Sequence, residues 1–303
     1  MYEQIAENRR NSLLLISIIL FVLLICGYFI GAANGMGFYG LFFSLLISCA
    51  LISFSFFSGD KAVLAASAAH RIQKQDNPQL FNVVEEMSIA SGLPMPKVYI
   101  IDDTAPNAFA TGRKPEFASI AVTTGLLSKL NRDELQGVIA HEMSHIKNYD
   151  ILYAMLVVIL VGTVALLCDI FRRSLFYGTF SSGRRRSSSS SRDSGPALLV
   201  MLIIALVLSI LAPIFAQLLQ LAVSRQREYL ADASAAQLTR YPEGLARALE
   251  KIANDKEVLE VANRATQHLY IVNPIKPFET RAQNNIFSTH PPIEERIRRL
   301  RSM

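Results

Sequence analysis

Two histidines and a glutamate carry the strongest chemical signal in the sequence. His141, Glu142 and His145 lie in the run HEMSH, which fits the pattern HExxH. Residues four apart project from one face of an α-helix, so both imidazoles can bind the same metal ion. Neutral imidazole is a good zinc ligand, and Glu142 is placed to take a proton from a water molecule that the metal activates. We therefore expect one Zn²⁺ ion, with Glu142 as the catalytic base.

A catalytic zinc ion has three protein ligands and an open position, so a third ligand must come from elsewhere. We expect Glu228, which begins the helical stretch EYLADASAAQL just after a long apolar run. Asp232 lies one turn on, where it can accept a hydrogen bond from a ligating imidazole and fix its tautomer. Three competing carboxylates lie further from the apolar run: Glu243, Glu250 and Glu257.

Residues 60–150 supply the elements that must position the histidines. Their pattern predicts a helix over 77–91, a short strand over 97–101 (KVYII) and a second strand over 118–124. Asn131 then predicts an N-cap, with Glu134 at capping-box spacing. The helix that opens there is expected to run through Tyr149 and to carry the HExxH pattern.

The stretch NAFATG at 107–112 is a candidate for substrate binding. Proteases bind substrates as an added strand at a sheet edge, where main-chain hydrogen bonds give affinity without demanding a sequence. We expect Asn107, Ala108, Phe109 and Ala110 to contact the substrate, with an ordinary surface strand and turn as the alternative. His70 and His268 have no ligand partner at helical spacing and are interpreted as structural or solvated.

Composition places the chain in a membrane. Of 303 residues, 51% are hydrophobic and 18% charged, a balance too apolar for a water-soluble protein of this size. Residues 11–59 contain no charged side chain, and about 20 apolar residues span a bilayer core. We expect apolar helices over 13–30 and 38–57, joined at a glycine-rich turn, rather than a cleaved signal peptide. Two later uncharged runs, 151–168 and 194–224, are each long enough to cross.

The connector at 171–193 is rich in arginine and serine and is interpreted as a solvated loop near anionic lipid headgroups. Its six arginines less Asp193 give +5, which equals the net charge of the whole chain. The basicity is therefore local, and nucleic acid is not an expected partner. All three cysteines fall in apolar runs, which excludes a disulfide framework and a cysteine zinc finger.

These boundaries give a transmembrane hairpin (1–59), a first catalytic part (60–150), a second apolar hairpin (151–224) and a second catalytic part (225–303). Lys61, Arg71 and Lys74 favour a cytoplasmic location for 60–150. The second hairpin then exports its arginines, against the positive-inside tendency, unless its helices do not fully cross. In either case both catalytic parts lie in one aqueous compartment.

Three alternatives compete with a protease at the membrane surface. An intramembrane protease would place Arg132, Asp133 and Glu134 in hydrocarbon, at high cost. A non-heme iron enzyme also uses two histidines and a carboxylate, but HExxH with its adjacent base suits hydrolysis better. A non-catalytic membrane scaffold or chaperone would keep the metal for structure, where Glu142 has no use as a base.

Several motifs together resemble the HtpX-type membrane zinc metalloproteases of bacteria, gluzincin relatives of the CAAX prenyl proteases. They are HExxH with Asp150 five residues after His145, SRQREYLAD from Ser224, NAFATG from Asn107, TTGLL from Thr123 and STHPPIEERI from Ser288. The resemblance covers nearly the whole chain, in order. It implies a mainly α membrane protein, with four apolar helices in two hairpins and a zincin-like α+β catalytic domain.

The resemblance also implies the functional residues. His141, His145 and Glu228 would be the zinc ligands and Glu142 the base of a zinc metalloendopeptidase. Its substrates would be damaged or misfolded membrane proteins, cut on the cytoplasmic side of the bacterial inner membrane in protein quality control. His290, before two prolines, is interpreted as part of a structural turn; the alternative that the resemblance implies is a position near the cleft, where His290 would stabilise the oxyanion. The connector at 171–193 departs from the resemblance, being longer and more basic than expected.

Overall fold

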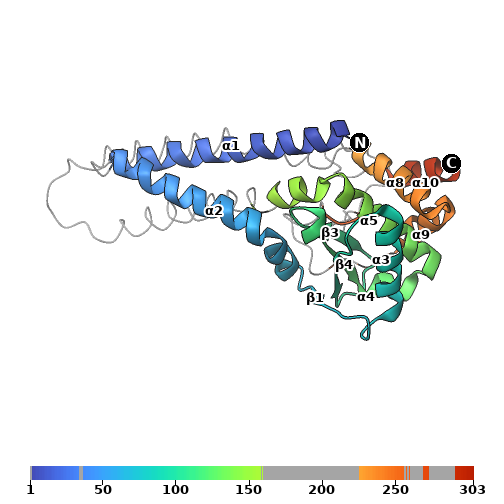
Figure 1. Ribbon diagram of the computed structural model, residues 1–303. Coiled ribbons are helices and arrows are strands. Elements are labelled where there is room, and N and C mark those ends of the chain that lie inside the picture. The colour runs from blue at the N-terminus through green and yellow to red at the C-terminus, as the bar shows by residue number, and fades with distance from the viewer. Residues whose placement is uncertain are drawn as a thin grey trace, which may run out of the picture.

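The computed structural model describes residues 2–33, 37–157, 159, 225–255, 257, 259, 269–272 and 291–303. Within these ranges, a long helical hairpin leads into a mostly helical unit with a small mixed sheet (Figure 1). Most of the second apolar hairpin and the whole connector at 171–193 lie outside the described residues, as do His268 and His290. Of that hairpin, residues 151–157 and 159 are described, and they are helical.

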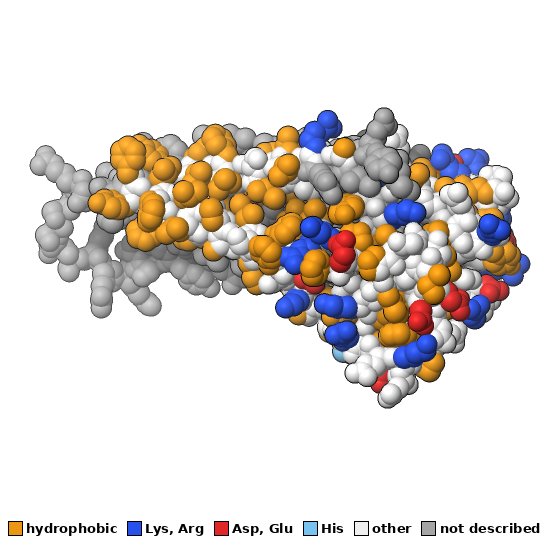
Figure 2. All heavy atoms as spheres, viewed as in Figure 1, with side chains coloured by type: hydrophobic (Ala, Val, Ile, Leu, Met, Phe, Trp, Pro, Cys, Tyr) orange, Lys and Arg blue, Asp and Glu red, His pale blue; other side chains and the backbone are white. Residues whose placement is uncertain are grey.

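Helices α1 (Tyr2–Ala33) and α2 (Gly37–Ala66) form the hairpin and lie side by side (Figure 1). Within the described ranges, the segment Phe38–Ala66 of α2 alone is long and apolar enough to cross a membrane, with a mean hydropathy of 2.2 over an 18-residue window. Only 11% of that window is buried. Figure 2 shows hydrophobic side chains over the visible face of the hairpin, whereas charged side chains gather on the mixed unit. The hairpin thus presents the surface that a lipid environment requires.

Helix α2 continues past the predicted end at residue 57 and carries Asp60 and Lys61 in its last turns. Asp60 and Lys61 end the uncharged run, but charged residues do not stop a helix, and no proline follows within α2. Gly59 also has a packing role, because a Cβ atom there would lie 2.7 Å from Cδ1 of Ile159 and 2.9 Å from Sδ of Met155. The glycine therefore lets the helix after residue 150 approach α2 closely.

The sheet contains β1 (His70–Arg71), β2 (Lys97–Ile101), β3 (Ala108–Thr111) and β4 (Ser119–Thr123) in the order β1-β2-β4-β3. Strands β2 and β4 are parallel, and the other two pairs are antiparallel. The predicted strand KVYII is confirmed at its expected bounds, and the second predicted strand is β4, one residue shorter at each end. Strand β3 occupies an edge of the sheet, as expected for NAFATG.

The mixed unit also contains a set of helices, most of which pack against one another. They are α3 (Pro78–Ser91), η1 (Pro115–Phe117), α4 (Thr124–Lys129), α5 (Arg132–Lys147), α8 (Arg225–Thr239), α9 (Pro242–Asn254) and α10 (Ile293–Arg301). The predicted helix at 77–91 is confirmed as α3, with Asn77 as its N-cap and Gly92 in the left-handed conformation after its end. The capping box of Asn131 and Glu134 is present at the start of α5.

Helix α5 lies at the centre of the core and packs against α3, α8, α9 and β3 (Figure 1). Leu135, Val138, Ile139 and Met143 of α5 are buried. Gly137 faces the backbone of Leu245 in α9, where an added Cβ atom would lie 2.7 Å from the amide nitrogen. The core thus fixes α5, the helix that carries HExxH, on several sides.

The prediction that this helix runs through Tyr149 is wrong. Helix α5 ends at Lys147, and Tyr149 adopts a φ of 61°. This left-handed conformation, unusual for a tyrosine, breaks the helix before a new one begins at Asp150. The break changes where Asp150 points, which matters for the site described next.

Candidate metal centre and active site

The two histidines of HExxH share one face of α5, as their spacing predicts. Their Nε2 atoms lie 3.2 Å apart, and the ring centroids 4.7 Å apart. His141 is buried and His145 nearly so. The buried apolar residues on the other faces of α5 hold both imidazoles in place.

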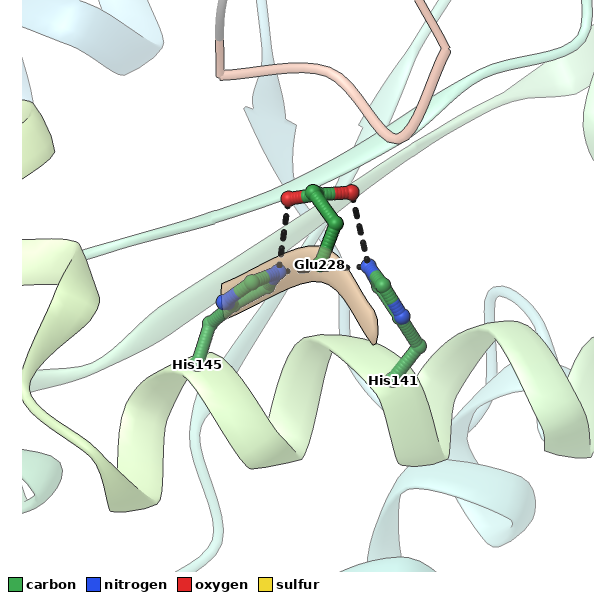
Figure 3. A group of neighbouring side chains, drawn as sticks. All are labelled: His141, His145 and Glu228. Carbon is green, nitrogen blue, oxygen red and sulfur yellow. Dashed lines mark hydrogen bonds and ion pairs between the residues drawn. The ribbon is translucent and has the colours of Figure 1, made fainter. Parts of the chain in front are cut away.

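Glu228 comes from α8, which crosses α5 in the packed core. One carboxylate oxygen lies 3.8 Å from Nε2 of His141, and the other lies 3.5 Å from Nε2 of His145 (Figure 3). One ligand atom from each residue lies within 4.8 Å of the others. Two imidazole nitrogens and a carboxylate oxygen at this separation fit a single transition-metal ion. The structure therefore brings together the three residues that the sequence suggested as ligands.

Two carboxylates hold the outer nitrogens of the imidazoles. Asp232 lies 3.0 Å from Nδ1 of His141, and Asp150 lies 3.0 Å from Nδ1 of His145. Each carboxylate favours the tautomer with its proton on Nδ1, which leaves Nε2 to bind a metal ion. Asp232 occupies the position expected for it. Asp150 had no assigned role in the sequence reading, because its reach to His145 depends on the helix break at Tyr149.

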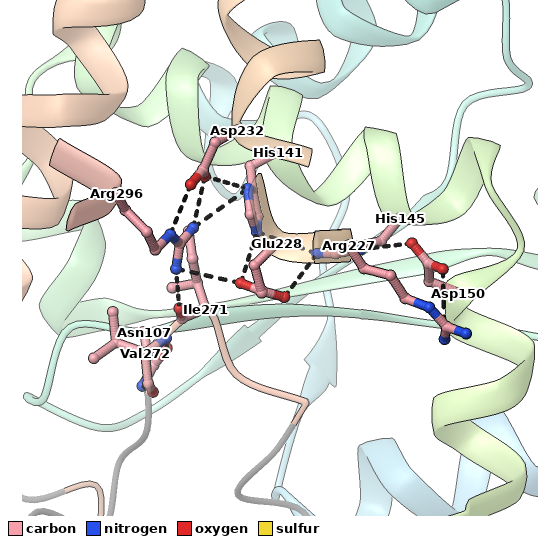
Figure 4. A network of polar contacts seen from close by, with 10 residues as sticks. All are labelled: Asn107, His141, His145, Asp150, Arg227, Glu228, Asp232, Ile271, Val272 and Arg296. Carbon is pink, nitrogen blue, oxygen red and sulfur yellow. Dashed lines mark hydrogen bonds and ion pairs between the residues drawn. The ribbon is translucent and has the colours of Figure 1, made fainter. Parts of the chain in front are cut away.

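Sequence reasoning also missed Arg296, which enters the site from α10 (Figure 4). Its Nε and Nη2 atoms donate to the two carboxylate oxygens of Asp232 at 2.8 and 2.7 Å. Its Nη1 atom donates to the carbonyl oxygen of Ile271 at 3.0 Å and lies 3.3 Å from a carboxylate oxygen of Glu228. A signal for this residue existed: Arg296 falls on the same helical face as Ile293, Ile297 and Leu300, where a core side chain belongs.

Burial dominates the electrostatics of the site. It raises the pKa of Glu142 to about 7, assisted by the nearby charge of Glu228 and opposed by His145 and Arg296. Burial would also raise the pKa of Asp232, but the charge and hydrogen bonds of Arg296, with the hydrogen bond to His141, lower it to about 2. Asp232 is therefore a carboxylate across the whole physiological pH range.

The pKa values of the two histidines are shifted in opposite directions. Burial lowers the pKa of His141, and Arg296 adds to this effect against the hydrogen bond to Asp232. Burial would lower the pKa of His145 too, but hydrogen bonds to Asp150 and Glu228 raise it well above its ordinary value. A metal ligand must be a neutral imidazole, so an ion that binds here displaces a proton from His145.

The expected substrate residues lie on or just before β3. The backbone of Ala110 donates a hydrogen bond to Glu142, which brings this edge strand against the acidic residue of HExxH. The carbonyl oxygen of Ala108 accepts a hydrogen bond from the amide of Ile271 at 3.0 Å, and the side chain of Asn107 donates to the carbonyl oxygen of Val272 at 2.9 Å.

The side chain of Phe109 does not face this edge. It is buried, and its ring packs edge-on against Tyr270 with a centroid distance of 5.1 Å. The backbone of Ile271 occupies part of the free edge of β3, at the carbonyl oxygen of Ala108.

The other described histidine and the competing carboxylates lie away from His141, His145 and Glu228. His70 is exposed on β1 and lies 3.7 Å from Asp102. The competing carboxylates have other partners: Glu243 pairs with Arg247 and Arg301, Glu250 with Arg301, and Glu257 with Lys129. None of the three contributes to the His141, His145 and Glu228 group.

A helix that presents two imidazoles and an acid of raised pKa to a carboxylate on a second helix defines a metal-dependent hydrolase. Comparisons with known proteins narrow this class. Residues 74–303 match the model of peptidase family M48. The chain belongs to this family and is a metalloprotease, and with the apolar α2 it is a membrane metalloprotease.

Curated relatives match along the full chain. A protein named "Protease HtpX homolog" from Dictyoglomus turgidum is 46% identical over 100% of this chain and 94% of its own. Proteins of the same name from Tropheryma whipplei (strain Twist) and Listeria monocytogenes serotype 4a are 48% and 42% identical, over 98% and 100% of their lengths. The resemblance to HtpX-type proteases is thereby confirmed.

The crystal structure of S. mikatae Ste24p shares the fold. It aligns with a TM-score of 0.51 at 22% identity, covering 99% of this chain and 67% of the other. At this identity the likeness concerns architecture alone. Mostly helical structure with a small mixed sheet is thus confirmed, while the predicted set of four apolar helices stays a prediction.

Proposed function

We propose that the protein is a zinc-dependent endopeptidase in which His141, His145 and Glu228 hold the ion. The observation that carries this proposal is the convergence of three ligand atoms within 4.8 Å, with both outer imidazole nitrogens held by carboxylates. The nitrogen and oxygen donors match those of catalytic zinc sites. When bound, zinc would polarise the scissile carbonyl group and lower the pKa of a water molecule.

Glu142 acts as the general base and acid in this proposal. It is the neighbour of His141 in sequence, is buried, and has a pKa of about 7. A catalytic group works best when its pKa lies near the operating pH, because it can then both accept and donate a proton. Glu142 takes the proton of the attacking water and delivers it to the leaving amine nitrogen.

Substrate binding is assigned to the edge of β3, at Asn107, Ala108, Phe109 and Ala110. The hydrogen bond between Ala110 and Glu142 supports this assignment, since a chain added along β3 would pass next to the base. Backbone pairing gives loose sequence preference. Asn107, Ala108 and Ala110 would contribute through the position of their backbone, and Phe109 through its packing on Tyr270. His290 remains a candidate for oxyanion stabilisation.

The catalytic unit would work at the cytoplasmic face of the bacterial inner membrane, with the chain crossing several times. Close packing of the mixed unit on α2 supports a site near the bilayer. The guanidinium of Arg113 lies over the rings of Phe57 and Phe117, with distances from Cζ to the ring centroids of 4.8 and 4.2 Å. Lys61 after the apolar part of α2 favours the cytoplasmic side. Suitable substrates are misfolded or damaged membrane proteins that present an unfolded segment beside a membrane span.

The test compares purified wild type with Glu142→Gln, each assayed for zinc content and for cleavage of an unfolded model membrane protein. We expect both to carry one zinc per chain and only the wild type to cut, with cleavage lost after chelation. Asp133→Asn, an exposed position on α5, serves as the matched control. Retained cleavage by Glu142→Gln would overturn the assignment of the base, and a wild type that holds zinc but cuts nothing would indicate a scaffold.

A further inference from the structure

Arg296 is a buried charge that the proposed chemistry does not use. Its side chain is 1% exposed, although it comes from α10, the last helix of the chain. Its guanidinium meets both oxygens of Asp232, one oxygen of Glu228 and the carbonyl oxygen of Ile271. Burying a cation is costly unless its donors are paired, and here the planar fork is matched to a carboxylate.

The position of Arg296 is unfavourable for a metal site if charge alone is considered. Its Nη1 atom lies 3.3 Å from Glu228, and Nη2 lies 3.5 Å from Nδ1 of His141, so a positive charge stands beside two of the residues that would bind a cation. A cation placed there repels the metal. The arginine therefore needs another contribution that outweighs this repulsion.

Arg296 can offset this repulsion by holding the groups around the metal site in a fixed arrangement. Both oxygens of Asp232 are fixed by the arginine fork, and one of them also lies 3.0 Å from Nδ1 of His141. The fork thereby holds the carboxylate of Asp232 in place as an acceptor for the Nδ1 proton of His141. The Nη1 atom of the same guanidinium also forms an ion pair with one oxygen of Glu228, at 3.3 Å. One side chain thus orients two of the three groups assigned to zinc.

We infer that Arg296 is a positioning residue, which sets His141, through Asp232, and Glu228 in the geometry that binds zinc before the ion arrives. This inference rests on the proposed function, because it presumes zinc at His141, His145 and Glu228. Arg296 touches none of the reacting groups. By its contact with Ile271 it also links α10 to the segment paired with the edge of β3.

Two variants separate geometry from charge. Arg296→Lys keeps the positive charge but loses the planar fork, whereas Arg296→Gln loses the charge. Zinc affinity is measured by competition with a chromogenic chelator on the full-length protein in detergent. If Arg296 positions the ligands, both variants bind zinc roughly 10- to 100-fold more weakly, the usual effect of losing an outer partner of a ligand. If charge dominates, Arg296→Gln binds zinc as tightly as the wild type or more tightly, which would overturn the inference.

Arg298→Gln is the matched control, because it removes an arginine from the same helix at a position whose side chain is 77% exposed. It should leave zinc affinity unchanged. Asp232→Asn removes the other partner of the contact between Arg296 and Asp232. Because the two residues act as one unit, the double variant with Arg296→Gln should lose no more zinc affinity than the stronger single variant. Additive losses would contradict the inference.

Two further measurements distinguish a failure of this inference from a loss of folding and from a failure of the proposed function. A circular dichroism melt accompanies each variant, and an unfolded Arg296→Lys would mean that the arginine serves the fold rather than the site, which also overturns the inference. If wild type and Arg298→Gln bind no zinc, the proposed function itself fails. If both bind zinc and the Arg296 variants bind it equally well, only the positioning role fails.

Discussion

Glu142 should make the metal-free protein less stable as the pH rises. Burial raises its pKa from 4.5 to about 7, so the folded protein holds a proton that the unfolded chain releases above pH 4.5. Below pH 4.5 the group is protonated in both states and has no effect. Between pH 4.5 and 7 the stability falls progressively, and above pH 7 the full cost of a buried carboxylate remains. At 1.36 kcal/mol for each pKa unit, this cost is about 3 kcal/mol.

Glu142→Gln removes this cost, because glutamine is neutral at every pH and can still accept the hydrogen bond of the Ala110 backbone. Thermal unfolding of metal-free wild type and variant is followed in detergent at pH 4.5 and pH 8. We expect equal melting temperatures at pH 4.5 and a variant that melts about 6–12 °C higher at pH 8. Asp133→Asn, exposed on the same helix, controls for a general loss of negative charge. Parallel pH profiles for wild type and Glu142→Gln would refute the reasoning.

Three further predictions rest on other contacts of the structure. Asp150→Asn weakens the acceptor 3.0 Å from Nδ1 of His145 and should lower zinc affinity about 10-fold or more in a chelator competition, and unchanged affinity would show that Asp150 does not orient His145. Gly125→Ala would place a Cβ atom 1.9 Å from the carbonyl oxygen of Thr104. It should therefore lower the free energy of unfolding by about 1–3 kcal/mol or more in denaturant titrations. An unchanged free energy of unfolding would mean that the backbones at Gly125 and Thr104 lie further apart. Removal of zinc by a chelator should lower the melting temperature. The free energy of unfolding should fall by about 2.7 kcal/mol if the free zinc concentration had been 100 times the dissociation constant. An unchanged melting temperature would mean that the ion does not bind in the folded site.

The elements nearest the chemistry could be predicted because their signals are local. The capping box of Asn131 and Glu134 fixes the start of α5 within four residues of sequence, and the spacing of His141 and His145 fixes their common face. The strand KVYII is short, β-branched and bounded by turn residues. In each case the pattern that specifies the element lies inside the element itself.

Contacts between distant segments could not be predicted in this way. Arg296 reaches Asp232 across 64 residues of sequence, and only the packing of α10 on α8 and α9 brings them together. The role of Asp150 depends on the left-handed backbone of Tyr149, a conformation that tyrosine seldom adopts and that its sequence does not signal. The pairing of Ile271 with Ala108 likewise joins segments with no shared local signal.

The most direct test of the zinc site is anomalous X-ray scattering at the zinc absorption edge from crystals of the purified protein. We predict a single anomalous peak in contact with Nε2 of His141, Nε2 of His145 and the carboxylate of Glu228. A peak bound by other residues, or one that leaves Glu228 out of contact, would contradict the central claim.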